Sequence, residues 1–426
     1  MYKKTTLKNN LTLVTHHMSG AYSVSIGIWL KVGSRYEKEH LSGISHFLEH
    51  IIFKGSKKYD SDTIKRQIEG SGGLLNGFTS EELTCYLAKV PQKRAYPTFK
   101  ILLDIALNPR LKQEDIQKER TVIIEEIKMY KDLPPHMVQE LLDETMWPRH
   151  PLGRNIAGTI ESVSSISRDD ILNFQSKYYR PQNMVVIFTG NIKHEDCLGF
   201  IHKALDSAET TEKDYSFQKF ISKQKGAEIR TSVKDIEQTK LAIGFPAYNR
   251  VHPKRYILAL ISIILGGNMS SRLFNEIREK KGLAYEISSQ YKQLMDTGAF
   301  YVHAGLDNKK IDLALRLILK ELSKLKKNLV SESELSRAKE YSLSQLAMSL
   351  EDTMEHMVFL GVSAATTKKI LDYNEIKKAV LKIKPGELKE VAKEIFNKGK
   401  INISIVGPIN EFDKGKCLNY TNINLD

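Results

Sequence analysis

Two histidines and a glutamate have the spacing of a metal site. His46 and His50 stand four residues apart in the segment HFLEHIIF, with Glu49 between them. On a helix this spacing places both imidazoles on one face, one turn apart, where they can reach a single ion. Neutral imidazoles suit zinc, and an adjacent carboxylate that is not a ligand can accept a proton from metal-bound water. The H-x-x-E-H order is the inverted form of a familiar zinc-hydrolase motif, so we expect one Zn²⁺ per chain.

A third ligand must come from another segment, because a catalytic zinc usually takes three protein ligands and keeps one position open. A helix expected over 113–130 offers glutamates at positions 114, 119, 125 and 126. Glu119 and Glu126 are seven residues apart, hence on one face, beside an apolar stripe that includes Ile123 and Ile127. The same pattern is typical of the ordinary border of an amphipathic helix. Spacing alone therefore leaves the choice of ligand open.

The elements that would position these side chains follow a recognisable order in the first half of the chain. Alternation of apolar and polar residues predicts strands, and helical spacing predicts helices. The strand at 22–32 is expected to bury one face. The strands are expected at 11–18, 22–32, 74–79, 83–90 and 184–189. The helices are expected at 44–55, 95–107, 113–130 and 169–178.

The second half repeats this order. Strands are expected at 239–245, 284–290 and 298–304, and helices at 255–265, 272–279, 311–325 and 334–350. The two halves also end alike, in ISRDDILNFQSKYYRPQNMVVIFTGNI and IKPGELKEVAKEIFNKGKINISIVGPI. Each of these is a helix, a turn, a strand and a Gly-x-Ile stop. Two copies of one unit explain this better than one large domain.

The fold expected is α+β, with two structurally similar domains. Each would be a mostly antiparallel sheet packed with helices. We place an N-terminal zinc-binding catalytic domain at 1–207, a polar linker at 208–230 and a C-terminal homologous domain at 231–426.

Composition favours a globular protein of a reducing compartment. The chain has 426 residues, of which 41% are hydrophobic and 27% charged, and its three cysteines are too few for a disulfide framework. No secretory signal is visible at the N-terminus, and the longest apolar run, 256–265, is about half the length needed to cross a bilayer. We expect a cytoplasmic location and no membrane partner. The net charge of +13 suggests nucleic acid only weakly, because no recognised nucleic-acid motif accompanies it.

These motifs resemble the insulinase/pitrilysin family of zinc peptidases, in particular its short two-domain bacterial members similar to the mitochondrial processing peptidase. In that family a glutamate ligand follows the H-x-x-E-H motif by about 76 residues, which falls on Glu126. A second glutamate that supports the site stands seven residues earlier, at Glu119. The resemblance therefore implies a zinc endopeptidase with ligands His46, His50 and Glu126 and with Glu49 as general base.

The resemblance extends to substrate binding. GGLLNGFTSEELTCYLAKV is similar to a family segment in which an exposed edge strand pairs with the substrate backbone; the residues that match are Asn76, Gly77, Phe78 and Thr79. Gly77 stands where the family usually has alanine. An edge strand is a suitable peptide receptor, because its unpaired N–H and C=O groups bind an extended chain regardless of its side chains.

In the second half, GGNMSSRLFNEIREKKGLAYEI resembles the family segment that carries a substrate-binding arginine and tyrosine, here Arg278 and Tyr285. The resemblance implies that each chain of this length forms half of a clamshell, that two chains close around a chamber, and that the partner's second domain completes each site. Because this chain carries both the zinc motif and the Arg278/Tyr285 pair, a homodimer acting on short or unfolded peptides is expected. A non-catalytic family relative serving as an assembly subunit is the alternative, although such subunits usually lose zinc ligands.

Overall fold

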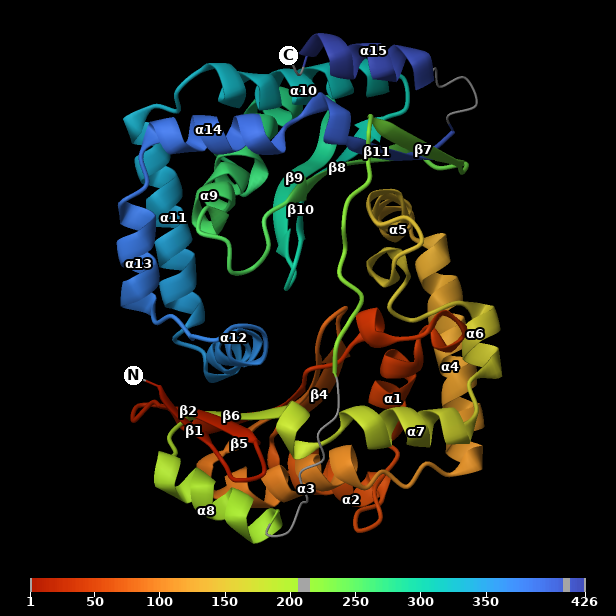
Figure 1. Ribbon diagram of the computed structural model, residues 1–426, viewed down its shortest axis with the longest axis vertical. Helices are drawn as coiled ribbons and strands as arrows, with labels where there is room; N and C mark the ends of the chain where they lie inside the picture. Colours follow the sequence, from red (N-terminus) through yellow and green to blue (C-terminus); the bar gives the residue numbers. More distant parts are fainter. Residues whose placement is uncertain (1, 206–214, 409–413, 425–426) are drawn as a thin grey trace. The chain divides into compact units, whose positions relative to one another are not determined.

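The computed structural model describes residues 2–205, 215–408 and 414–424 (Figure 1). The chain forms two compact units, and each is built from three separate stretches. Unit 1 comprises Met1–Lys128, Arg154–Gln218 and Ala347–Asp372, and unit 2 comprises Met129–Gly153, Lys219–Leu346 and Tyr373–Asp426. Among the described helices, none is long and apolar enough to span a membrane.

Unit 1 contains a six-stranded sheet in the order β1-β2-β6-β3-β5-β4. Its strands are β1 (Lys3–Thr6), β2 (Thr12–His17), β3 (Ser23–Leu30), β4 (Leu74–Thr79), β5 (Thr84–Pro91) and β6 (Met184–Gly190). Neighbouring strands are antiparallel except β2 and β6, which are parallel. The strand β4 lies at one edge of this sheet.

Helices cover both faces of this sheet. One face packs against a core shared by α1 (Ile44–Ile52), α2 (Ser61–Ile68), α3 (Ala95–Leu107), α4 (Gln113–Asp132), α7 (Arg168–Tyr178) and α8 (His194–Ala204); the short α6 (Ile160–Ser165) adds Val163 to the same core. The other face packs against α12 (Thr353–Thr366) through a second cluster (Figure 1). Close packing is visible at Gly361, where an added β-carbon would overlap the indole of Trp29.

The prediction that the strand at 22–32 buries a single face is wrong. Residues 24–30 of β3 are all buried. The reason is α12, which comes from the second half of the sequence and covers the face that was expected to meet solvent. A strand covered on both sides carries apolar residues on both.

Unit 2 contains a five-stranded sheet in the order β7-β11-β8-β10-β9. Its strands are β7 (Glu228–Val233), β8 (Gln238–Ala247), β9 (Ala284–Gln293), β10 (Gly298–Asp307) and β11 (Asn402–Gly407). Only β7 and β11 are parallel among these neighbours. The order and directions match the run β2-β6-β3-β5-β4 of unit 1, so the expected α+β fold with two similar halves is confirmed.

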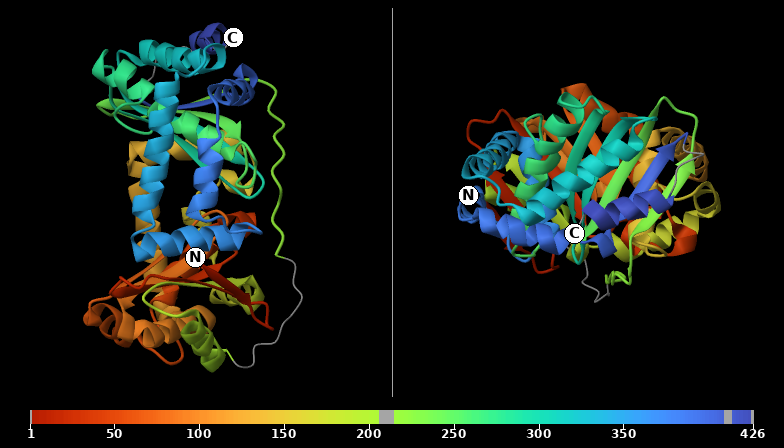
Figure 2. Two further views of the ribbon diagram at one scale, coloured as in Figure 1. Left: turned by 90° about the vertical axis from the view of Figure 1, so that its left-hand side faces the viewer. Right: turned by 90° about the horizontal axis from the view of Figure 1, so that it is seen from above.

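The helices of unit 2 follow the same plan. A cluster from α5 (Pro134–Met146) packs with β8, β10 and β11. The remaining elements are α9 (Arg255–Gly266), the π-helix η7 (Phe274–Glu279), α10 (Ile311–Lys327), α11 (Glu332–Ser349), α13 (Tyr373–Leu381), α14 (Pro385–Ile395) and α15 (Lys414–Asn424). Viewed from above, α10 and α15 lie side by side (Figure 2).

The two compact units do not coincide with the contiguous domains predicted from the sequence. The helix α5 belongs to the first half of the chain but packs in unit 2, and α12 belongs to the second half but packs in unit 1. Strand β7 begins at Glu228, inside the range predicted as linker, and residues 208–214 of that range lie outside the described residues. The contiguous domain boundaries therefore stay a prediction from the sequence repeat. Each compact unit includes one helix from the other half of the sequence.

Candidate metal centre

The helix α1 carries both histidines and starts at a tightly fixed point. Gly43 precedes it with φ 93°, a left-handed conformation that favours glycine, and its α-carbon faces the carbonyl of Ala157. The buried carboxylate of Glu37 accepts the N–H groups of Gly43 and Ser45, each at 2.8 Å. These contacts satisfy backbone donors at the start of the helix, where the helix dipole favours negative charge.

The faces of α1 and α4 follow from their apolar spacing. On α1, Phe47, Leu48 and Ile51 are buried in the core, whereas His46 and His50 on another face of the helix are half-buried. On α4, buried Ile123 and Ile127 fix the helix in the same core. The carboxylates that border this stripe are thereby held toward α1.

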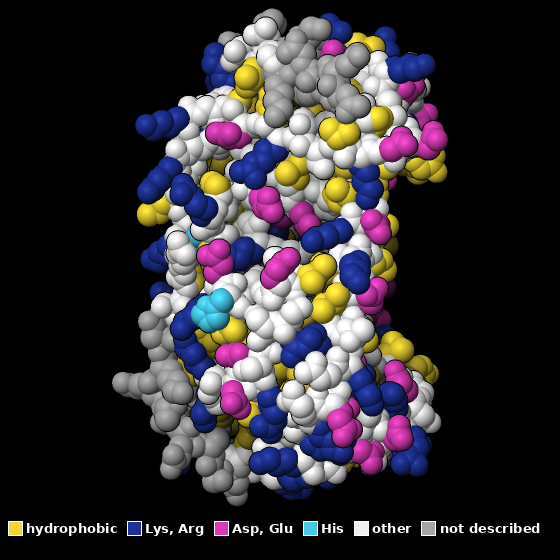
Figure 3. Space-filling view, turned by 90° about the vertical axis from the view of Figure 1, so that its right-hand side faces the viewer, with side chains coloured by type: hydrophobic (Ala, Val, Ile, Leu, Met, Phe, Trp, Pro, Cys, Tyr) yellow, Lys and Arg dark blue, Asp and Glu magenta, His cyan; other side chains and the backbone are white. Residues whose placement is uncertain are grey.

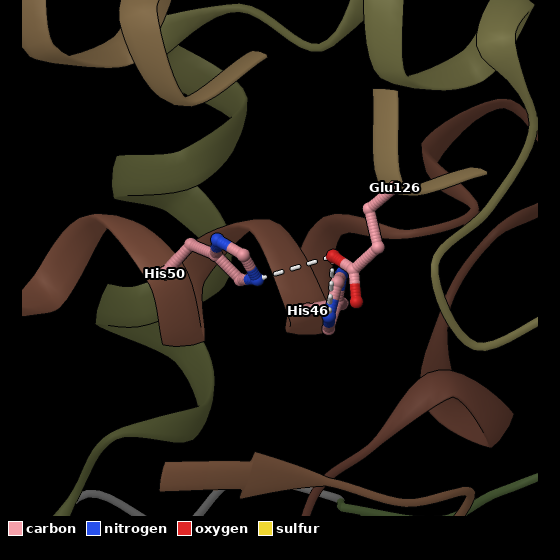
Figure 4. A group of neighbouring side chains, drawn as sticks. All are labelled: His46, His50 and Glu126. Carbon is pink, nitrogen blue, oxygen red and sulfur yellow. Dashed lines mark ion pairs between the residues drawn. The ribbon is translucent and has the colours of Figure 1, made fainter. Parts of the chain in front are cut away.

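The structure brings His46, His50 and Glu126 together (Figure 4). One ligand atom from each lies within 4.8 Å of the others. The Oε2 atom of Glu126 is 3.5 Å from Nε2 of His50 and 3.7 Å from Nε2 of His46. Among the described residues, this is the one group of three or more such side chains that could hold a metal ion.

The geometry of these three residues fits zinc. The Oε2 atom of Glu126 is buried and has no hydrogen-bond partner among the described residues, and both nitrogens are farther away than a normal hydrogen bond. Ligands about 2.1 Å from a tetrahedral ion stand about 3.4 Å apart, close to the two separations observed. An ion between the three atoms would satisfy the otherwise unpaired oxygen.

The pKa values of the two histidines shift in opposite directions. Burial, with the neighbouring His50, lowers the pKa of His46 to about 4, so its imidazole is neutral and able to ligate at neutral pH. Burial also acts to lower the pKa of His50, but the hydrogen bond to Glu119 and the nearby carboxylates outweigh it and raise that pKa. The same carboxylates would favour a cation placed between the ligands.

Glu119 lies directly behind His50. Its Oε2 atom is 3.2 Å from Nδ1 of His50, and its Oε1 atom pairs with the ammonium group of Lys54. Only 5% of Glu119 is exposed. A carboxylate at this position orients an imidazole and fixes which nitrogen faces the ion. Nδ1 of His46, in contrast, is buried without a hydrogen-bond partner in the described part of the chain.

Glu49 faces the edge strand β4. The hydroxyl of Thr79 donates to Oε2 of Glu49 at 3.2 Å, and a β-carbon added at Gly77 would lie 3.2 Å from Oε1 of Glu49. Burial raises the pKa of Glu49, partly offset by His50 and the Thr79 hydroxyl. A raised pKa brings a carboxylate closer to the proton affinity that suits a general base near neutral pH.

The four predicted substrate-binding residues lie in or at the end of β4 but differ in their surroundings. The side chain of Asn76 accepts the N–H of Gly77 at 2.8 Å. The ring of Phe78 packs edge-on against Trp29 at 5.4 Å, and Thr79 contacts Glu49. Since β4 ends the sheet, the described residues pair with one of its sides only.

Arg278 and Tyr285 lie in unit 2, in η7 and at the start of β9, whereas the three candidate ligands lie in unit 1. The guanidinium carbon of Arg278 lies 4.6 Å from the ring centre of Phe274 and 5.7 Å from that of Tyr285. Tyr285 is 73% exposed. The two residues therefore form a neighbouring pair of donors on unit 2.

Two residues that contact this centre or its helix were missed by sequence reasoning. Lys54 stands four residues after His50, a spacing that could have pointed to it, because positions 46, 50 and 54 continue one helical face. Glu37 carries no such signal, since it reaches the start of α1 from a preceding loop.

Fold and site together define a class of metalloproteins that combine two similar α+β halves with an inverted histidine motif. The chain belongs to the insulinase family, peptidase family M16. The family model "Insulinase (Peptidase family M16)" matches residues 12–160, and the model "Peptidase M16 inactive domain" matches residues 165–341.

Several relatives resemble the chain over nearly its full length. A Rickettsia bellii protein named "Uncharacterized zinc protease" is 33% identical over 95% of this chain and 97% of its own. A Bacillus subtilis protein named "Uncharacterized zinc protease YmxG" is 32% identical over 93% and 96%. The crystal structure of a protease from Helicobacter pylori superposes with a TM-score of 0.91 at 25% identity, covering 96% of this chain and 99% of that one.

Proposed function

We propose that the protein is a zinc-dependent endopeptidase that hydrolyses peptide bonds in short or unfolded peptides. The observation that carries this proposal is the convergence of His46, His50 and Glu126 around a buried carboxylate oxygen for which the described part of the chain offers no other partner. Glu49 lies beside them against an edge strand. The relatives named zinc proteases agree with this reading.

The mechanism follows from what each side chain does. A zinc ion held by His46, His50 and Glu126 would supply Lewis acidity, lowering the pKa of a water and polarising the peptide carbonyl. Glu49 would take the proton from the attacking water and deliver it to the leaving amine. Thr79 holds the Glu49 carboxylate through its hydroxyl. Extended substrate would pair with the open side of β4.

Arg278 and Tyr285 are proposed to act on the same substrate from the second unit of a partner chain. A guanidinium and a phenol are suitable donors toward the oxygen that gains charge in the transition state. This arrangement requires a homodimer that encloses the peptide in a chamber. Mixing Glu49→Gln chains with Arg278→Ala chains should restore part of the activity, because one of the two mixed sites regains both groups. No recovery in any mixture would contradict shared sites.

A scaffold role without catalysis is the second candidate, and the complete ligand set argues against it. A nucleic-acid partner has less support. On the face shown in Figure 3, lysine and arginine side chains alternate with aspartate and glutamate instead of gathering into one basic patch. The described cysteines are free and buried, which favours a reducing compartment, and we propose the cytoplasm.

The test combines metal content with cleavage. Elemental analysis of the purified protein should find about one zinc per chain, and a quenched fluorescent peptide should be cleaved without chelator but not with it. Glu49→Gln should keep the zinc and lose cleavage. Full activity of that variant would exclude Glu49 as the base, and activity that survives complete metal removal would overturn the proposal.

A further inference from the structure

Three side chains contact one another in sequence behind the metal centre: His50, Glu119 and Lys54. The ammonium group of Lys54 pairs with Oε1 of Glu119, and Oε2 of Glu119 is 3.2 Å from Nδ1 of His50. Each carboxylate oxygen therefore has its own partner. Lys54 follows the last turn of α1, where its backbone N–H donates to Ile51 at 3.1 Å, so its side chain starts from a fixed point.

The contact with Glu119 determines the state of the imidazole. An ionised carboxylate only accepts hydrogen bonds, so Nδ1 of His50 must carry the proton. The lone pair is then on Nε2, the atom 3.5 Å from Glu126. A carboxylate that is 5% exposed needs a partner to stay charged, and Lys54 supplies a full positive charge in direct contact.

This support is one-sided. Nδ1 of His46 has no hydrogen-bond partner among the described residues, so the protein orients the ring of His50 but not that of His46 in this way. Weakening the Lys54–Glu119 contact would therefore loosen the partner of the one imidazole that is held at its second nitrogen. Removing a residue that supports a metal ligand from behind typically lowers metal affinity by about 10–100-fold.

We propose that Lys54 is a positioning residue of the metal centre, acting through Glu119 on His50 to raise the affinity for zinc. The inference rests on the zinc site proposed above. Lys54 is 40% exposed on its side chain, so its ammonium group keeps contact with water while one N–H is committed to Glu119. Replacing it should not open a cavity in the core.

The experiment measures zinc binding to the full-length metal-free protein by competition with a chromophoric chelator. Lys54→Met should bind zinc about 10–100-fold more weakly than the parent chain. Lys54→Arg should recover most of the affinity, because it keeps the charge. Lys58→Met is the matched control: it removes the same charge nearby, but Lys58 is 75% exposed and its nitrogen lies 3.9 Å from Asp104. That control should bind zinc like the parent chain.

A double-mutant cycle tests whether Lys54 acts through Glu119. In a Glu119→Gln background, adding Lys54→Met should cause little further loss, whereas independent effects would multiply. The absorption spectrum of the cobalt-substituted protein should also change in Lys54→Met and return in Lys54→Arg. Unaltered affinity in Lys54→Met, or multiplying effects in the cycle, would overturn the inference. If the parent chain itself bound no zinc, the proposed function would fail instead, so the two failures are distinguishable.

Discussion

Replacing Glu126 with glutamine should weaken zinc binding without lowering the stability of the metal-free protein. Without an ion, Oε2 of Glu126 is a buried oxygen that receives no hydrogen bond from any residue the structure describes, and it faces two imidazole nitrogens at 3.5 and 3.7 Å. An unsatisfied buried group costs about 1–3 kcal/mol. Since the side chain as a whole is 22% exposed, we expect the lower end, so metal-free Glu126→Gln should equal the parent in stability or exceed it by about 1 kcal/mol.

The effect on zinc follows from ligand linkage. Loss of a charged ligand should raise the dissociation constant by at least about 100-fold, because outer partners alone contribute 10–100-fold. At a free zinc concentration 100 times the parent constant, the parent gains about 2.7 kcal/mol of stability. The variant, at or below its own constant, gains at most about 0.4 kcal/mol. A role in packing alone would predict a loss of stability with or without zinc.

Urea unfolding in chelator-buffered zinc measures both quantities. The chain has two tryptophans, Trp29 in unit 1 and Trp147 in unit 2, so a Trp147→Phe background lets fluorescence report unit 1 alone. Glu125→Gln is the control, because Glu125 is 64% exposed and pairs with Lys128 at the surface. A surface pair is worth at most about 1 kcal/mol and should leave the zinc increment unchanged. A metal-free Glu126→Gln protein that is less stable than the parent but keeps the full zinc increment would show that Glu126 serves packing and not zinc binding.

Three further predictions concern the surroundings of the centre. Burial raises the pKa of Glu37 to about 7, above its ordinary value of 4.5. Between these two pH values the unfolded chain has lost the proton and the folded chain has kept it, so the free energy of unfolding falls as pH rises, by up to about 1.4 kcal/mol per pH unit. Glu37→Gln should flatten that slope in unfolding curves. Thr79→Val should lower kcat on the order of tenfold with KM nearly unchanged if the hydroxyl acts only on Glu49, whereas a rise in KM would show that it binds substrate. Gly361→Ala should destabilise unit 1 by about 1–3 kcal/mol without altering zinc affinity; equal stability would mean that α12 shifts freely.

The candidate centre could be anticipated from sequence because its geometry is mostly local. Two histidines four residues apart, and two glutamates seven residues apart, lie on one helical face whatever the rest of the fold does. The choice of Glu126 over Glu125 needed one more fact, which the resemblance supplied and the structure now describes: Glu126 faces the histidines, whereas Glu125 pairs with Lys128.

The features that sequence reasoning missed depend on contacts between distant segments. The amphipathic pattern of α12 shows that it buries a face but not which sheet it covers, so the two-sided burial of β3 was invisible. Glu37 and Lys54 were missed for the same reason. Their partners, the start of α1 and Glu119, are brought close only by tertiary packing. The spacing of Lys54 places it on the face of the two histidines, but no pattern in the sequence shows that its partner is Glu119. Glu37 carries no signal of either kind.

The distribution of the proposed machinery separates binding of the metal from turnover. All three candidate ligands, the base and the edge strand belong to unit 1, and Arg278 and Tyr285 belong to unit 2. Zinc affinity should therefore depend on unit 1 alone, and Arg278→Ala should bind zinc like the parent chain while losing kcat. Replacing Lys54 or Glu119 should have the opposite effect, lowering zinc affinity more than it lowers kcat of the zinc-loaded enzyme. A loss of zinc affinity in Arg278→Ala would mean that unit 2 helps to build the metal centre itself. Zinc binding would then not be a property of unit 1 alone.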